Sequence, residues 1–239
     1  MISKERILLA LRGELEPLGF RYLKSKKEFR KKANKDICVC INYNAGCYHR
    51  GFIDVMISVC AKYADIDRAI REIKDLEPID YGSFSLRCRL QHLLPGGDAG
   101  NPEYYFQDTD SEEVNTQILT LLLFQARTYL IPYTEKLSYT GGALEVAIEL
   151  DQEGMVHPRC AVPMMYCIWR HDKKAALDYL EEIRQRMYNL VTPQEWALME
   201  RMKNGEEVPR SNKPFNAIFY EEFLESAEKF KEWMERQDY

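Results

Sequence analysis

The sequence predicts an α+β fold, in which an antiparallel sheet of four or five strands is packed by helices on one face and followed by an all-helical C-terminal portion. Three observations support this class: two consecutive alternating stretches at 36–43 and 51–63, another at 83–94, and helical spacing throughout after residue 140. A period of two indicates strands that bury one face. We expect a sheet domain over 1–150 and a helical portion over 151–239 packed on it; the alternative is a single domain.

Residues 36–43 and 51–63 form the best-defined strands. Each alternates apolar with more polar side chains, so one face of each strand is apolar: Ile37, Val39, Ile41 and Tyr43 in the first, and Ile53, Val55, Ile57, Val59 and Ala61 in the second. A turn-prone link at 44–50 joins the two stretches. The sequence therefore predicts two neighbouring antiparallel strands at the centre of the sheet.

Further elements extend this core on both sides. Apolar spacing predicts an amphipathic helix at 3–16 with Ser3 as its N-cap, a helix at 65–76, and a long helix from 110 to 130 that covers the sheet and is ended or kinked by Pro132. An edge strand is expected at 20–32, a fourth strand at 83–94 and a short aromatic fifth at 104–106. Later helices are expected at 140–150, 160–169, 173–189, 192–203 and 217–237.

Composition places the chain among ordinary globular proteins. It has 239 residues, of which 46% are hydrophobic and 30% charged, so a disordered or collagen-like chain is excluded. The longest apolar run, at 118–124, is far shorter than the roughly 20 residues of a membrane helix, and the patch at 7–11 is too short for a signal peptide. Seven cysteines without the spacing of a small disulfide framework indicate reduced thiols. We therefore expect a cytoplasmic protein.

Charge is distributed unevenly along the chain. The net charge is −5, yet residues 21–35 contain a single acid, Glu28, and eight basic residues: Arg21, Lys24, Lys26, Lys27, Arg30, Lys31, Lys32 and Lys35. Aromatic residues interleave with these cations, so the basic strand 21–35 could follow a phosphate backbone while its rings stack on bases. The simpler interpretation is a solvated edge strand, and we favour it because nucleic-acid-binding domains usually carry a net positive charge.

Cys38, Cys40, Cys47 and His49 lie within twelve residues and include the ligand types that zinc prefers. The C-x-C spacing differs from the usual C-x-x-C, and residues two apart on a strand are about 6.6 Å apart between Cα atoms. We therefore interpret these cysteines as buried free thiols and expect no metal.

The strand at 83–94 offers candidate binding residues on both faces. Arg87 and Arg89 share the polar face and could clamp an anion, or simply be solvated. His92 is expected on the apolar face, where a hydrogen-bonded core histidine is a simpler interpretation than a general base. The chain contains no H-E-x-x-H, G-x-S-x-G, G-x-x-x-x-G-K-[ST] or G-x-G-x-x-G motif, so we assign no catalytic residue and no cofactor.

Several short motifs occur in an order that resembles a bacterial family of domains of unknown function, some of whose members look like immunity proteins encoded beside secreted toxins. The resemblance covers about residues 1–190. It rests on Leu18-Gly19-Phe20, Leu93-Leu94-Pro95-Gly96-Gly97, Tyr104-Tyr105, Leu130-Ile131-Pro132-Tyr133 and Asp172-Lys173-Lys174-Ala175. The family favours tryptophans where this chain has Tyr104 and Tyr105, and we include these two tyrosines with Arg87, Arg89 and His92 as candidate binding residues. The family supplies no catalytic residues.

Three functional hypotheses follow. The first is a non-enzymatic binding protein whose partner is another protein, of the toxin-immunity kind, because an acidic inhibitor suits a basic target. The second is an enzyme acting on an anionic small molecule or nucleic acid through Arg87, Arg89 and His92. The third is a nucleic-acid-binding module that uses the basic strand.

Overall fold

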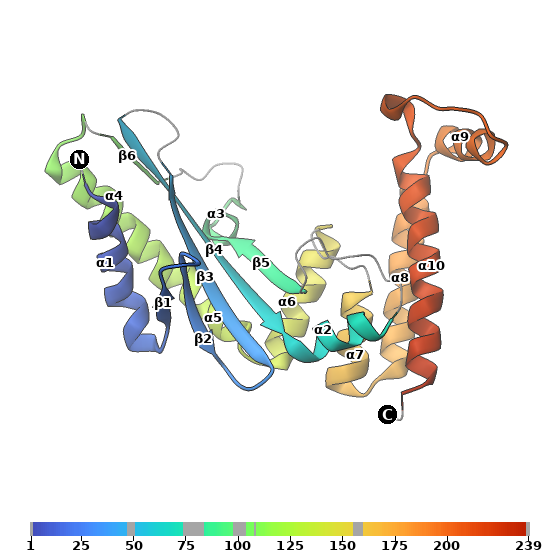
Figure 1. Cartoon of the computed structure of the whole chain (residues 1–239), viewed down its shortest axis with the longest axis horizontal. Helices are drawn as coiled ribbons and strands as arrows, with labels where there is room; N and C mark the ends of the chain where they lie inside the picture. Colours follow the sequence, from blue (N-terminus) through green and yellow to red (C-terminus); the bar gives the residue numbers. More distant parts are fainter. Residues whose placement is uncertain are drawn as a thin grey trace. The chain divides into compact units, whose positions relative to one another are not determined.

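A computed structural model describes residues 2–46, 51–73, 84–97, 104–107, 109–154 and 160–237 (Figure 1). The fold is α+β, as predicted. The chain divides into two compact units, and each is described by itself. The sheet unit comprises Met1–Ala64 and Ser85–Val146, and the helical unit comprises Asp65–Phe84 and Ala147–Tyr239.

The sheet unit is built on an antiparallel sheet of six strands, one more than the largest number expected. The strands are β1 (Arg21–Leu23), β2 (Glu28–Lys32), β3 (Ile37–Gly46), β4 (Phe52–Tyr63), β5 (Ser85–Arg89) and β6 (Tyr104–Gln107). The first five follow one another in sequence order across the sheet, and β6 pairs with β4. Each of β5 and β6 pairs with its own part of β4, β5 with 58–62 and β6 with 52–55.

Strands β3 and β4 are neighbouring antiparallel strands at the centre of the sheet, as the alternation predicts. Ile37 lies opposite Tyr63 and Gly46 opposite Asp54, so the register runs without interruption over ten residue pairs. The side chains expected on the apolar face are all buried, from Ile37 to Tyr43 in β3 and from Ile53 to Ala61 in β4. Within the expected link at 44–50, residues 44–46 belong to β3 and residues 47–50 lie outside the described residues.

The predicted single strand at 20–32 is wrong, because this segment forms a hairpin. β1 and β2 pair through Tyr22 and Phe29, with a four-residue turn between them. Lys27, in that turn, has a φ of 50°, which is left-handed and ends any extended conformation. The hairpin places Tyr22 and Phe29 on the same face, with ring centroids 5.0 Å apart, whereas a continuous strand would have placed them on opposite faces.

The predicted strand at 83–94 is also too long. β5 ends at Arg89, and the short helix α3 (Leu90–Leu93) follows it. The alternation predicted within β5 is present, since Leu86 and Cys88 are buried while Arg87 and Arg89 are exposed. His92 lies in α3, so it does not share the strand face to which the alternation assigned it.

Helices of the sheet unit cover the apolar face of the sheet. Helix α1 (Lys4–Leu15) begins after the N-cap Ser3, and its first carbonyl, that of Lys4, accepts a hydrogen bond of 3.2 Å from the Tyr43 hydroxyl. Helix α4 (Glu112–Gln125) starts after the N-cap Ser111, and its Gln125 accepts a hydrogen bond from the hydroxyl of Tyr104. Figure 1 shows α4 running along the strands. Both tyrosines belong to the apolar face, so both helices lie on that side.

The long helix continues past Pro132, where the sequence predicted an end or a kink. Helix α4 passes into a π-helical turn, η3 (Ala126–Leu130), and then into α5 (Ile131–Lys136). The Ile131 amide donates to the Ala126 carbonyl five residues earlier. A turn of this width lets the helix bypass the N–H that Pro132 lacks. Helix α5 stays on the sheet, since the Tyr63 hydroxyl donates to the Leu137 carbonyl just beyond it at 3.1 Å.

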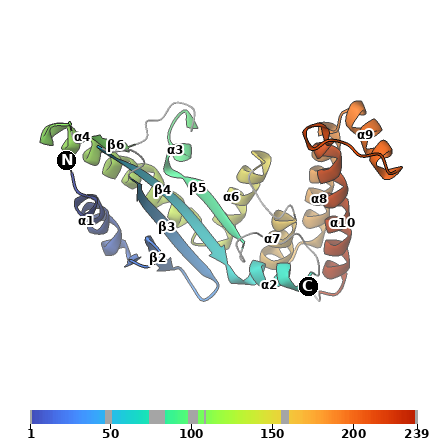
Figure 2. The ribbon, with the colours of Figure 1, turned by 45° about the horizontal axis from the view of Figure 1, so that its top comes forward.

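The C-terminal helices occur where the sequence predicted them. They are α6 (Thr140–Gln152), whose residues 147–152 belong to the helical unit, α7 (Ala161–Arg170), α8 (Lys173–Leu190), α9 (Pro193–Lys203) and α10 (Phe215–Glu235). Helices α8 and α10 run side by side (Figures 1 and 2). The indoles of Trp169 and Trp233 donate to Asp65 and Glu72 at 2.7 and 3.0 Å, which joins α2 (Ala64–Glu72) to this unit. The predicted end of α2 at residue 76 lies outside the described residues.

No helix in the described residues is both long and apolar enough to span a bilayer.

Candidate functional sites

The face of the sheet opposite the helices carries polar and charged side chains in register, and we call it the open face. One row crosses five strands and contains, in order, Arg21, Arg30, Cys40, Cys60 and Arg87. The next row contains Leu23, Glu28, Asn42, Ser58 and Arg89, and a third contains Lys32, Cys38, Lys62 and Ser85. The open face therefore brings Arg87 and Arg89 together with cations of the N-terminal hairpin, which lie far from them in the sequence.

Six cations belong to this face: Arg21, Arg30, Lys32, Lys62, Arg87 and Arg89. All but Arg30, which is half-buried, are exposed, and Arg30 forms an ion pair with Glu28. None of the other five forms an ion pair within the part of the chain that the structure describes. Their charges are therefore available to an anion from solvent.

A cavity of about 410 Å³ opens at the hairpin end of the open face. It is lined by Gly19, Arg21, Leu23, Arg30 and Lys32, so three of its five lining residues are cationic. The Nε atom of Arg30 is buried and has no hydrogen-bond partner among the described residues. A hollow lined by three cations is suited to an anion such as a phosphate group.

The remaining residues of the predicted basic patch do not join this face. Lys24, Lys26 and Lys27 are exposed in the turn between β1 and β2. Lys31 extends toward the opposite face, where its ammonium group lies 5.6 Å from the centroid of the Phe20 ring. Lys35 is exposed and lies 3.9 Å from the Asp36 carboxylate. The predicted patch is thus divided among the two sheet faces and two turns.

The two adjacent tyrosines of β6 have opposite surroundings. Tyr104 is buried on the apolar face, and burial raises the pKa of its hydroxyl to about 12, so this residue belongs to the core. Tyr105 is 41% exposed on the open face, where its ring contacts that of Phe52 edge to face with centroids 5.7 Å apart. Only Tyr105 of the pair can contact a ligand on the open face.

Three thiols lie in the middle of the open face. The sulfurs of Cys38 and Cys40 are 3.9 Å apart, and the Asn42 amide donates to the Cys60 sulfur at 3.6 Å. Hydrogen bonding with Cys60, and then burial, raise the pKa of Cys40; hydrogen bonding with Cys40, and then with Asn42, lowers the pKa of Cys60. Within the described residues no group of three metal-ligating side chains comes together, and Cys47 and His49 lie outside them.

His92 does not line up with the two arginines. It is half-buried on α3, beyond the end of β5, and so is absent from the rows that contain Arg87 and Arg89. The geometry that the enzyme hypothesis required, with these three side chains converging, is therefore not formed by the strand register.

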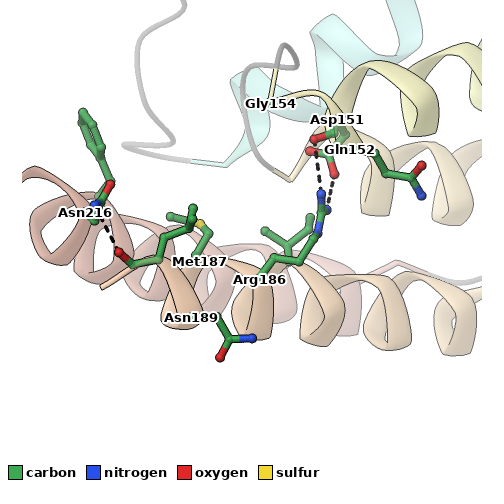
Figure 3. A pocket seen from close by; sticks show the side chains of 10 residues that line it. Asp151, Gln152, Gly154, Arg186, Met187, Asn189 and Asn216 are labelled. Atoms are coloured by element: carbon green, nitrogen blue, oxygen red, sulfur yellow. Dashed lines mark hydrogen bonds and ion pairs between the residues drawn. The ribbon is translucent and has the colours of Figure 1, made fainter. Parts of the chain in front are cut away.

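A second candidate site lies in the helical unit (Figure 3). A cavity of about 540 Å³ is lined by residues of α6, α8 and α10 and of the turn after α6: Asp151, Gln152, Gly154, Ile183, Arg186, Met187, Asn189, Leu190, Asn216 and Phe219. Figure 3 shows Arg186 and Asp151 pointing toward each other at one end and Asn216 at the other, with Met187 between them. The apolar walls come mainly from α8, whose Ile183, Met187 and Leu190 recur at helical spacing.

An ion pair between a buried carboxylate and a half-buried guanidinium closes one end of this cavity. The Asp151 side chain is 8% exposed; it pairs with Arg186 and accepts a hydrogen bond of 2.9 Å from the Tyr179 hydroxyl. Arg186 also donates to the Asp151 carbonyl at 3.2 Å and lies over the Tyr179 ring. Burial, and then the Asp151 carboxylate, raise the pKa of Tyr179. The Asp151 carboxylate thus holds both Arg186 and Tyr179, whereas the buried Nε atom of Arg186 has no hydrogen-bond partner among the described residues and lies 3.9 Å from the Glu182 carboxylate.

The pairing of Asp151 with Arg186 beside the helical-unit cavity is not predictable from the sequence. Asp151 and Arg186 are 35 residues apart, and each alone is an ordinary charged residue of an amphipathic helix. Leu190, Phe215 and Phe219 are large apolar residues that the structure shows to be exposed rather than buried. Exposed large apolar residues near one another often mark a binding surface.

Comparisons of the chain with protein-family models, with curated proteins and with solved structures found no match.

Proposed function

We propose that this protein is a non-enzymatic binding protein, and that the helical unit holds a basic protein partner at the cavity between α6, α8 and α10. The observation that carries the proposal is the coincidence of this cavity with exposed apolar side chains on a strongly acidic unit. Leu190 is 63% exposed and Phe219 42% exposed, and both line the cavity.

The apolar side chains provide the contact area. Phe215 and Phe219 lie on successive turns of α10, with ring centroids 6.3 Å apart, and Phe215 is exposed as well. Binding energy at protein interfaces concentrates in a few large side chains that fill pockets on the partner surface. A cavity of about 540 Å³ is large enough to admit one such side chain.

The net charge of the helical unit indicates the sign of the partner's charge. The helical unit contains 24 Asp and Glu against 16 Lys and Arg, a net charge of −8 that exceeds the −5 of the whole chain. A field of this sign accelerates association with a cationic surface and disfavours acidic competitors. Because Asp151 and Arg186 neutralise each other, we attribute the attraction of a basic partner to the other acidic residues of the helical unit. We attribute specificity for that partner to the apolar walls of the cavity.

The family resemblance suggests which kind of partner this is. If the chain is of the immunity type, the partner is a toxin encoded nearby, and many toxins that act on nucleic acids are basic because their substrate is anionic. The interaction would then inhibit the toxin by occupying its surface, which requires no chemistry from this protein.

Site-specific photocrosslinking tests the proposal. A photoreactive benzoylphenylalanine at position 190 is expected to crosslink one basic polypeptide in a lysate of the source organism, identified by mass spectrometry. The matched control carries the same group at Leu177, which is also exposed on α8 but lies about 20 Å along the helix. Phe219→Asp should reduce the yield at position 190, whereas Leu177→Asp should not.

Three results would overturn the proposal: equal crosslinking from positions 190 and 177, crosslinking of an acidic polypeptide, or crosslinking to a second copy of this chain.

A further inference from the structure

We propose that the open face of the sheet unit binds single-stranded nucleic acid, with phosphates held by its cations and a base stacked on Tyr105. This inference concerns a different surface, and a partner of the opposite charge, from the protein-binding cavity of the helical unit.

The dimensions of the open face suit an extended strand. Arg21 and Arg87 lie at the two ends of a row across five strands, about 19 Å apart at about 4.8 Å per strand. Tyr105 pairs with Asp54, six residues along β4 from the Cys60 of that row, or about 20 Å. A chain of several nucleotides can therefore contact the cations and the aromatic ring together, as on other sheet platforms.

The cationic hollow is the best-defined part of the surface. Arg21, Arg30 and Lys32 surround about 410 Å³ at one end of the row, and the Nε atom of Arg30 lacks an acceptor among the described residues. Glu28 holds the other side of the Arg30 guanidinium, which fixes its orientation. Pre-oriented arginines recognise phosphate by paired hydrogen bonds, so this hollow is where we place one phosphate group.

Charge is segregated between the two units in a way that favours this ligand. The sheet unit has 17 Lys and Arg against 14 Asp and Glu, a net charge of +3, and the acidic surplus of the chain belongs to the helical unit. The argument from net charge against nucleic acid therefore does not apply to the unit that carries the site.

The aromatic ring distinguishes nucleic acid from other polyanions. An acidic peptide would use the cations but gains little from an exposed tyrosine, whereas every base can stack on it. The Phe52 ring contacts the Tyr105 ring edge to face, with centroids 5.7 Å apart. Helices α1, α4 and α5 lie on the apolar side of the sheet, so none of these three can enter a duplex groove from the open face, and a single strand with unpaired bases is the form that fits.

Fluorescence anisotropy with a labelled twelve-nucleotide oligouridine tests the inference on the full-length protein. Arg87→Ala/Arg89→Ala should weaken binding at least about tenfold at low salt and reduce the slope of log affinity against log salt by about 1.4. The matched control, Arg12→Ala/Arg127→Ala, removes two exposed positive charges from helices on the covered side of the same unit. This control variant should change neither the affinity for oligouridine nor the salt slope appreciably. Tyr105→Leu should weaken binding about fivefold or more.

Circular dichroism confirms that each variant is folded before binding is compared. The inference is wrong if the wild-type protein does not bind the oligonucleotide at 50 mM salt or if the two double variants weaken binding equally. It is also wrong if polyglutamate of matched charge displaces the oligonucleotide as effectively as unlabelled oligouridine does.

Discussion

The Asp151 carboxylate holds two side chains of α8 beside the cavity of the helical unit. It pairs with the Arg186 guanidinium and accepts a hydrogen bond of 2.9 Å from the Tyr179 hydroxyl. One acid near the end of α6 therefore fixes the position of α6 against α8 at this point.

Replacing Asp151 by alanine should be strongly destabilising, because it leaves a half-buried guanidinium and a buried phenol without their acceptor. We expect Asp151→Ala to lower the free energy of unfolding by about 3 kcal/mol, measured by urea denaturation followed by circular dichroism. Glu181→Ala is the control, since it breaks an exposed pair with Arg184 in the same unit and should leave the urea midpoint almost unchanged. Equal shifts for the two variants would contradict this account.

At the scale of elements, the sequence was most informative where periodicity was long. β3 and β4 were predicted correctly because their alternation is sustained and each buries one face. The sequence predicts one strand where β1 and β2 form a hairpin, because the turn contains neither glycine nor proline and the left-handed conformation of Lys27 has no signal in the sequence. The same limit applies to β5, where an apolar alternation continues into the first turn of α3.

Replacing glycine by alanine should change the free energy of unfolding in opposite directions at two helical positions, Gly13 and Gly142. A methyl group at Gly13 in α1 meets no atom within 4 Å, so Gly13→Ala should raise the free energy of unfolding by about 0.5–1 kcal/mol. At Gly142 in α6 it would lie 2.3 Å from the Lys136 carbonyl oxygen and 2.8 Å from the Tyr139 ring, so Gly142→Ala should cost about 1–3 kcal/mol. Urea denaturation measures both, and shifts of the same sign would refute this assignment.

At the scale of the whole molecule, the main feature is the separation of charge between the two units. The net −5 of the chain conceals a sheet unit of +3 and a helical unit of −8, and the helical unit includes residues 65–84 from between β4 and β5. The sequence shows the basic segment at 21–35, but the separate unit that holds the acidic surplus combines residues 65–84 with 147–239, which are far apart along the chain. Net charge over the whole chain therefore does not describe the charge of either unit.

The two proposed surfaces should be separable by mutation. Arg87→Ala/Arg89→Ala should weaken oligouridine binding without changing the photocrosslinking yield at position 190, and Phe219→Asp should do the reverse, because the changes alter different units and ligands of opposite charge. Anisotropy and crosslinking measure the two effects on the same preparations. A variant that is folded but loses both activities would show that the ligands do not use independent sites.

The π-helical turn η3 has a consequence for how this chain should be aligned with any relative. A turn closed by a hydrogen bond between residues 126 and 131 holds one residue more than a regular α-helical turn. Leu122, Ala126, Leu130 and Thr134 follow one another at intervals of four residues, and all of them are buried. In a uniform α-helix each step of four residues would rotate the side chain by about 40° from the preceding one. The wider π-helical turn offsets this rotation and keeps the four side chains on one side of the helix. A relative with an unbroken helix here should therefore be shorter by one residue and need no proline at the equivalent position.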